Sequence, residues 1–309
     1  MTAVNTQHLK GRDGASEAVP ASPAGATPPG PGRPTDLTRR HTSMSSRVSG
    51  IVSSAWRPSL LLVALGVIWY LVSKSGLVAE YLVPSPGRTL ETMRDNGPFL
   101  WDATLITLWE TVLGFLLAAL LGVVAAVVMV YSPTVERTLY PLLLFAQVIP
   151  KIAVAPLFVV WFGFGLSPKV VIAVLMAFFP VVISGVAGLR SVRPEILELA
   201  DTMGANSWHT FTKIRFPASL PHLFSGLKVA ATLAVTGAVV GEFVGSNRGL
   251  GYAILQANGN FDTPMLFGGL IIMSVMGILL FGLIALAEWL LLPWQPSRRT
   301  GNSITLPLA

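Results

Sequence analysis

Long apolar runs, separated by short polar segments, dominate the chain from residue 56 to residue 292. A helix of about 20 mostly apolar residues is long enough to cross the hydrocarbon core of a bilayer. The runs predict six such helices, at 56–75, 103–131, 137–163, 170–189, 220–245 and 264–292. The expected fold class is therefore an all-α polytopic membrane protein with six transmembrane helices.

Prolines lie inside the third and fourth of these segments. The third contains Pro150, Lys151 and Pro156, and the fourth contains Pro180. A proline inside a helix removes a backbone donor and clashes with the preceding turn. Within a membrane, a broken backbone is tolerated where it is buried in protein or lines a cavity. We therefore expect kinks or breaks in both spans.

The segments at the two ends of the chain are polar. Residues 1–46 are rich in Ala, Pro, Gly, Ser and Thr, which predicts a disordered tail, and residues 296–309 form a short second tail. With the N-terminus in the cytoplasm, fourteen Lys and Arg residues lie on the cytoplasmic side and five on the outer side. Positive charge favours cytoplasmic loops, so both termini are expected to be cytoplasmic. The N-terminal tail contributes seven of the fourteen, and without them the split is seven to five.

Composition excludes several classes of function. The chain has 309 residues, of which 52% are hydrophobic and 12% are charged, and it has no cysteine. Disulfides, thiolate metal sites and cysteine nucleophiles are thereby excluded. The four histidines lack metal-ligand spacing, and no catalytic set is visible, so we expect neither an enzyme nor a metal or other cofactor. The net charge of +6 fits cytoplasmic loops and anionic lipid better than nucleic acid.

The loop between the fourth and fifth segments is unusually rich in helix-terminating signals. Pro194 suits the first turn of a helix, and Gly204 can close that helix in a left-handed conformation. Asn206 or Ser207 can cap a second short helix, which Pro217 is expected to end. The pattern predicts two amphipathic helices joined by a tight turn.

Two functions fit an amphipathic loop of this kind. Its apolar face could lie on lipid headgroups, or it could dock into a groove on a partner protein. The hydrophobic pattern alone leaves both open.

The stretch "ELADTMGANSWHTFTKIRFP" resembles the EAA loop of ABC importer permeases. That pattern has Glu, two small residues, three variable residues, Gly, nine variable residues, Ile, one variable residue, Leu and Pro. The matching positions are Glu198, Ala200, Gly204, Ile214 and Pro217. Leu199 and Phe216 depart mildly from the pattern. In the family this loop docks on the ATPase subunit.

The resemblance extends over residues 80–295. Similar stretches include "AQVIPKIAVAPLFVVWFGFGLSPKVVI" and "SGLKVAATLAVTGAVVGEFVGSNRGLGYAI". They resemble permeases of the nitrate/sulfonate/taurine type and relatives that import thiamine precursors or riboflavin. The resemblance implies a MetI-like permease domain at 80–295, with a coupling loop at 194–217 and one extra N-terminal helix. It also implies a bacterial cytoplasmic membrane, two ABC ATPase subunits, an extracytoplasmic substrate-binding protein and a second permease, as in a homodimer.

Two features that the chain lacks agree with a permease that works with a separate ATPase and a separate substrate-binding protein. It contains no Gly-x-x-x-x-Gly-Lys-[Ser/Thr] phosphate loop, so ATP must be bound by another chain. The predicted outer loops are too short for a ligand-binding domain, so substrate delivery needs a separate protein.

Four polar residues within the spans are candidates for the translocation pathway. Gln147 and Lys151 flank Pro150, where Lys151 could attract an anionic or carbonyl-bearing substrate or extend toward an interface. Thr232 and Thr236 share a helix face and could contact substrate or bond to their own backbone.

The remaining charges are expected near span ends. We expect Glu110 to face water and Lys228 to extend toward the interface. Glu242 could form an outer gate with Arg248 or pair with it to fix the loop. In that loop Gly245, Gly249 and Gly251 fit a re-entrant turn. The alternative function, an ion-gradient-driven secondary transporter, usually shows inverted repeats and mid-depth carboxylates, neither of which we find.

Overall fold

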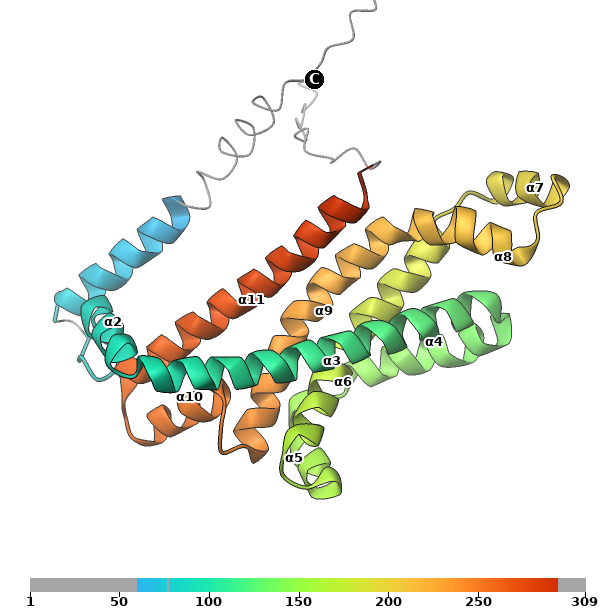
Figure 1. The fold of residues 1–309 in the computed structure, drawn as a ribbon. Coiled ribbons are helices and arrows are strands. Elements are labelled where there is room, and N and C mark those ends of the chain that lie inside the picture. The colour runs from blue at the N-terminus through green and yellow to red at the C-terminus, as the bar shows by residue number, and fades with distance from the viewer. Residues whose placement is uncertain (1–59, 77, 294–309) are drawn as a thin grey trace, which may run out of the picture. The chain divides into compact units, whose positions relative to one another are not determined.

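The computed structural model describes residues 60–76 and 78–293, in which every regular element is a helix (Figure 1). The predicted tails at 1–46 and 296–309 lie outside the described residues. A short apolar helix, Leu60–Lys74, comes first. It is followed by α2 (Pro86–Asp95), α3 (Gly97–Tyr131), α4 (Pro133–Val148), α5 (Lys151–Phe162), α6 (Leu166–Leu189), α7 (Pro194–Thr202), α8 (Ser207–Thr210), the π-helical turn η1 (Phe211–Arg215), α9 (Phe216–Gly245), α10 (Leu250–Gly259) and α11 (Thr263–Leu291).

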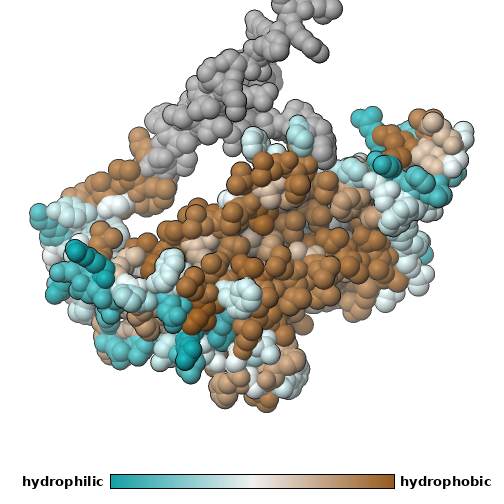
Figure 2. Space-filling view, in the orientation of Figure 1, coloured by the Kyte–Doolittle hydropathy of each residue, from teal (hydrophilic) through white to brown (hydrophobic). Residues whose placement is uncertain are grey.

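Four helical stretches are long and apolar enough to cross a bilayer: α3, α6, the continuous stretch Ser207–Gly245, and α11. The pair α4 and α5 makes a fifth crossing if the two helices count as one broken span. In Figure 2 apolar residues cover the visible sides of α3 and α11, while hydrophilic residues gather around α2 and α10 and around α7 and α8. The predicted all-α membrane class is confirmed, with four or five long spans plus the shorter N-terminal helix.

The prolines have different effects on the helices that contain them. The chain breaks at Ile149 and Pro150, and α4 and α5 are bent by 98° at this point. Pro156 and Pro180 instead lie inside α5 and α6, whose helical structure continues past them. The predicted break is therefore confirmed at Pro150, whereas α6 runs unbroken through the fourth span.

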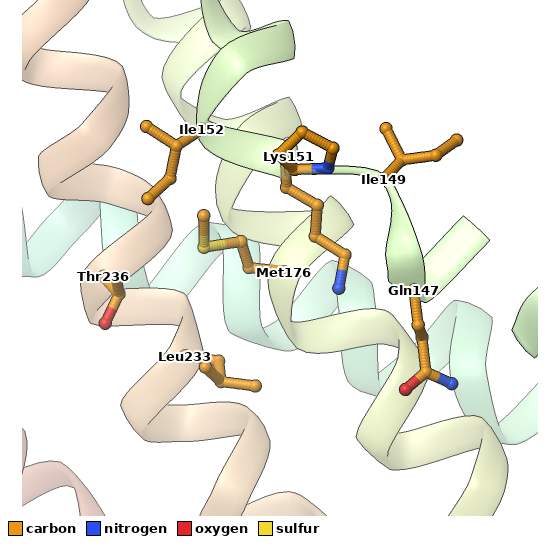
Figure 3. Close-up of a pocket in the computed structure, with 8 residues that line it drawn as sticks. Gln147, Ile149, Lys151, Ile152, Met176, Leu233 and Thr236 are labelled. Carbon is orange, nitrogen blue, oxygen red and sulfur yellow. The ribbon is translucent and has the colours of Figure 1, made fainter. Parts of the chain in front are cut away.

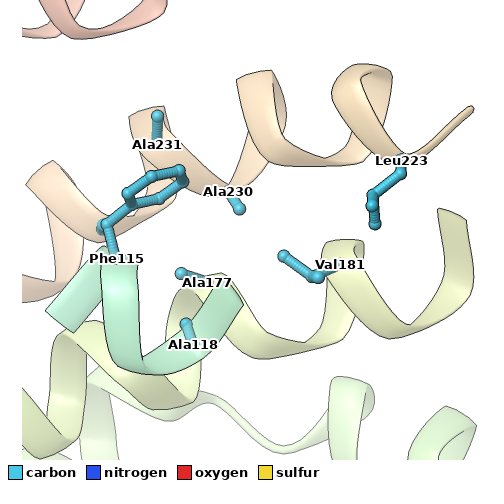
Figure 4. Packing of buried hydrophobic residues seen from close by; sticks show 8 residues of the cluster. Phe115, Ala118, Ala177, Val181, Leu223, Ala230 and Ala231 are labelled. Atoms are coloured by element: carbon cyan, nitrogen blue, oxygen red, sulfur yellow. The ribbon is translucent and has the colours of Figure 1, made fainter. Parts of the chain in front are cut away.

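Helices α3, α6 and α9 form the core of the protein. Phe115 and Ala118 of α3 pack with Ala177 and Val181 of α6 and with the alanines of α9 (Figure 4). Glycine lets the backbones approach closely: a Cβ on Gly237 would lie only 2.6 Å from the Cα of Ala173. Small residues at helix interfaces are how membrane helices gain close van der Waals contact. The three helices therefore pack tightly along their length.

The outer layer is much less buried. Only 11% of the most apolar window of α11 is buried within the chain, and α4 has no buried residue. These faces are apolar, so they suit lipid or another membrane helix.

Candidate functional site

The loop between α6 and α9 folds as two short helices around a glycine. Pro194 is in the first turn of α7, which ends at Thr202 with Met203 as its C-cap residue. Gly204 has φ = +76°, and its N–H donates to Asp201 O at 2.9 Å. The next N–H, of Ala205, donates to Ala200 O at 2.9 Å. These two bonds close the helix, as expected for a left-handed glycine.

The second short helix begins as predicted but does not end as predicted. The Asn206 side chain caps it by accepting from His209 N at 2.8 Å. We expected Pro217 to end this helix, and that prediction is wrong. The backbone widens into the π-helical turn η1, in which Phe216 N donates to Phe211 O, and Pro217 then lies in the first turn of α9. Pro217 has no N–H to donate to the preceding turn, and the wider π-helical turn accommodates the missing bond, so helix continues from Ser207 to Gly245.

Three large apolar side chains of this loop are mostly exposed. Leu199 is 60% exposed, Met203 78% and Trp208 69%. Of the five positions that match the EAA pattern, Glu198 and Gly204 are exposed and Ala200 is buried. Ile214 and Pro217 are half-buried. The loop thus presents an apolar surface to whatever covers it.

The loop is also attached to the ends of α3 and α4. The Phe211 ring packs edge-on against Tyr131, with centroids 5.9 Å apart, and the Arg215 guanidinium lies 5.9 Å from the Tyr131 ring. Arg190, at the end of α6, makes an ion pair with Glu136 of α4. The loop is therefore fixed to the spans rather than hanging free.

The break between α4 and α5 opens onto a hollow of about 340 Å³. Gln147, Lys151 and Thr236 supply its polar side chains, as shown in Figure 3. The rest of its lining is apolar: Ile149, Pro150, Ile152, Met176 and Leu233. The Lys151 ammonium lies 4.5 Å from the centroid of the Phe179 ring, within range of a cation–π contact. Three of the four pathway candidates thus meet at one place, and the gate candidate Glu242 is not among the lining residues.

The two threonines of α9 bond to their own helix. Thr232 Oγ1 donates to Val229 O at 2.8 Å, and Thr236 Oγ1 donates to Thr232 O at 3.3 Å. Both hydroxyls therefore bond to the backbone of their own helix, which is one of the two roles expected from the sequence. Both residues remain exposed, but only Thr236 lines the hollow.

The charges expected near water are largely buried. Glu110 is 2% exposed and accepts from Lys169 Nζ at 2.5 Å, so the prediction that Glu110 faces water is wrong. Lys169 itself is 6% exposed. Lys228 makes an ion pair with Glu288, which lies near the C-terminal end of α11. Sequence spacing gave no signal of the first pair, whose members lie 59 residues apart on different helices.

Glu242 is fully buried and lies apart from the hollow. Its Oε1 accepts from Thr107 Oγ1 at 2.6 Å, and its Oε2 accepts from Gly251 N at 2.5 Å. Among the ion pairs of the described residues there is none between Glu242 and Arg248, so that expected pairing is wrong. The re-entrant turn is present, with Gly249 at φ = +103° directly before α10.

The chain is similar in sequence to a known family of membrane transport proteins. The family model described as "Binding-protein-dependent transport system inner membrane component" matches residues 118–291. The chain is 39% identical to the formylaminopyrimidine transport permease protein ThiX of Halalkalibacterium halodurans, over 78% of this chain and 96% of that protein. It is 38% identical to the riboflavin transport system permease protein RibX of Chloroflexus aurantiacus, over 83% of this chain and 97% of that protein.

A solved structure shows the same fold. The inward-facing MetNI methionine ABC transporter matches with a TM-score of 0.53 at 20% identity, covering 64% of this chain and 97% of that one. Together with its relatives, this match establishes the MetI-like fold. The chain is a multi-pass inner membrane protein and belongs to the family of binding-protein-dependent transport system inner membrane components, the non-catalytic permease subunits of ABC importers.

Proposed function

We propose that this chain is one of two identical permeases in an importer driven by two ATPase subunits on the cytoplasmic side and served by a substrate-binding protein outside. Residues 80–295 form the permease domain, and the helix Leu60–Lys74 is part of a sixth span. Both termini and the loop at residues 194–217 then lie in the cytoplasm. We refer to residues 194–217 as the coupling loop.

The apolar surface of the coupling loop carries this proposal. Leu199, Met203 and Trp208 are each more than half exposed on a loop that also bears charged residues. A short helix with such a face fits a groove on a partner protein. The caps at Gly204 and Asn206 hold that face in one shape, which suits a defined protein groove better than a fluid headgroup layer. The proposed partner is the ATPase subunit.

The coupling loop is connected to the core helices, which would carry its motion into the membrane-spanning part of the protein. The loop directly follows α6 and continues without a break into α9. These helices pack tightly against each other and against α3. A shift of the loop upon ATP binding would therefore move the core as a body, which is the rocking expected for alternating access.

The hollow beside Lys151 is the proposed part of the translocation pathway. It is open, and it adjoins α4, which has no buried residue within the chain. A second copy packed on this side would close the hollow and supply the same residues again. Lys151 and Gln147 would then offer hydrogen-bond donors to the solute.

The lining of the hollow favours a heterocyclic solute with carbonyl oxygens. Ile149, Ile152, Met176 and Leu233 provide apolar surface for a ring, while Lys151 provides one cation. A sulfonate would lose more hydration on entering so apolar a site. Relatives named for formylaminopyrimidine and riboflavin are 39% and 38% identical to this chain, whereas those named for aliphatic sulfonates and taurine are 34% and 29% identical. We therefore propose a pyrimidine- or flavin-like substrate.

Uptake by reconstituted vesicles tests the proposed function. The chain is purified with its partner ATPase and binding protein, and uptake is assayed with ATP inside the vesicles. Uptake that requires ATP and the ATPase supports the proposal. Full uptake driven by an ion gradient without any ATPase would instead support a secondary transporter.

The substrate class has its own test. Binding of a formylaminopyrimidine, riboflavin and taurine to the purified binding protein is measured by calorimetry. Tight binding of one of the two heterocycles is expected. Preference for taurine would refute the heterocyclic assignment while leaving the permease function intact.

A further inference from the structure

The N-cap residue of helix α10 is a glycine, which has no side chain to accept a hydrogen bond from the helix. Gly249 is the N-cap residue and has no side chain, so the first N–H groups of the helix have no local acceptor. Those groups donate instead to side chains from other helices. Leu250 N donates to Thr107 Oγ1 at 2.8 Å, and Gly251 N donates to Glu242 Oε2 at 2.5 Å. The cap of α10 is therefore supplied by α3 and α9.

The two capping side chains are also bonded to each other. The Thr107 hydroxyl donates to Glu242 Oε1 at 2.6 Å while accepting from α10. Thr107 and Glu242 are both 0% exposed, so water does not compete for these bonds. One hydroxyl and one carboxylate thus join α3, α9 and α10.

The glycines of the re-entrant turn allow this close approach. A Cβ on Gly249 would overlap the carboxyl group of Glu242. A Cβ on Gly251 would lie 2.8 Å from Glu242 Oε2 and 3.0 Å from Val239 O. The turn therefore accommodates the carboxylate only because both positions lack a side chain.

Helix α6 joins the same region through a buried ion pair. Glu110, one turn after Thr107 on α3, binds Lys169 of α6 at 2.5 Å, and their side chains are 3% and 7% exposed. Gly241, next to Glu242, packs directly on Lys169, and a Cβ there would lie 2.8 Å from the Lys169 Cα. Removing one partner of such a buried pair would leave an uncompensated buried charge. Four helices are thus linked at one level of the helix bundle.

Helix α9 connects this level to the coupling loop. The helical stretch Ser207–Gly245 is 39 residues long and unbroken. At about 1.5 Å per residue, Ser207 and Glu242 lie roughly 50 Å apart along it. We propose that Glu242 and Thr107 are positioning residues that fasten α10 to α9 and α3, so that the outer end of the permease moves with the coupling loop. This inference rests on the proposed function, because it assigns a role to the motion that the ATPase would drive.

The test measures whether α10 stays attached to α9. The chain has no native cysteine, so spin labels can be placed on Phe243→Cys in α9 and Gln256→Cys in α10, both exposed positions. Distances between the labels are measured by pulsed electron spin resonance in the full complex, with and without ATP. Thr107→Val removes the hydroxyl at nearly constant shape, and Thr107→Ser is the matched control that keeps it. Glu242→Gln is the second variant, because it replaces one of the two accepting oxygens with an NH2 group that only donates.

A positioning role predicts a specific combination of results. The distance distribution is narrow in the unmutated protein and in Thr107→Ser, and it broadens in Thr107→Val and Glu242→Gln. Uptake falls roughly tenfold in the last two, while the ATPase still copurifies and keeps its basal rate.

Two results would overturn the inference. One is a distance distribution that stays narrow in both Thr107→Val and Glu242→Gln, whatever their thermal stability. The other is unchanged uptake by both variants. If the unmutated complex contains no ATPase, the proposed function fails first, and this inference fails with it.

Discussion

Replacing Gly204 with valine perturbs the turn of the coupling loop and little else. Gly204 has φ = +76°, which side-chain-bearing residues rarely adopt. A Cβ at this position would meet no atom within 4 Å, so valine causes no clash with neighbouring elements. The whole cost therefore comes from the backbone conformation of the turn.

That cost can be estimated. A non-glycine residue held in a left-handed conformation costs on the order of 1–3 kcal/mol, and a β-branched residue lies toward the upper end. Each 1.4 kcal/mol is about a factor of ten in an equilibrium, so the docking-competent turn becomes roughly 5- to 150-fold less populated. Asparagine tolerates the same conformation, so Gly204→Asn should retain most activity.

The assay compares uptake and ATPase stimulation in reconstituted complexes. We expect Gly204→Val to impair both and Gly204→Asn to retain both. Gly259→Val is a matched control, because Gly259 is equally uncrowded but has no positive φ. Wild-type uptake and ATPase stimulation in Gly204→Val would refute the docking role of this turn.

Three further changes test the pathway residue Lys151, the docking surface of the coupling loop and the buried ion pair. Lys151→Met should lower uptake several-fold without loss of the ATPase from the purified complex, and unchanged uptake would remove Lys151 from the pathway. Trp208→Ala should weaken ATPase binding by on the order of 2 kcal/mol, measured by titrating the ATPase against the permease, and equal affinity would contradict contact at this residue. Lys169→Met leaves Glu110 buried without its partner and should destabilise the protein by about 3–5 kcal/mol in thermal unfolding. The double variant Lys169→Met/Glu110→Gln should recover much of that loss, and no recovery would argue against the pairing.

Local signals made the coupling loop predictable. Pro194, Gly204 and Asn206 each act on bonds within a few residues, so their positions in the sequence were enough to place two helices and the turn. The end of the second helix was not predictable in the same way. Pro217 looked like a stop, but the π-helical turn before it lets the helix continue, and sequence spacing does not reveal such a turn.

The buried polar residues could not be placed from sequence because their partners are distant. Glu110 finds Lys169 on another helix, and Glu242 finds Thr107, which is 135 residues away. Hydropathy placed Glu110 near a span end, where water was the simplest partner. Only the packing of α3 against α6 and α9 brings these groups together. The hollow beside Lys151 was partly predictable, since the break at Pro150 marked the place where polar residues could gather.

Site-directed crosslinking tests whether the coupling loop contacts the ATPase. Met203→Cys places a thiol at a position that is 78% exposed on the loop, in a chain without native cysteine. Phe261→Cys, at a position that is 85% exposed between α10 and α11, is the control. We expect a short bifunctional reagent to link the Met203→Cys chain, and not the Phe261→Cys chain, to the ATPase in a transport-active complex. An active complex in which Met203→Cys reacts with a small thiol reagent but gives no link to the ATPase would contradict this contact.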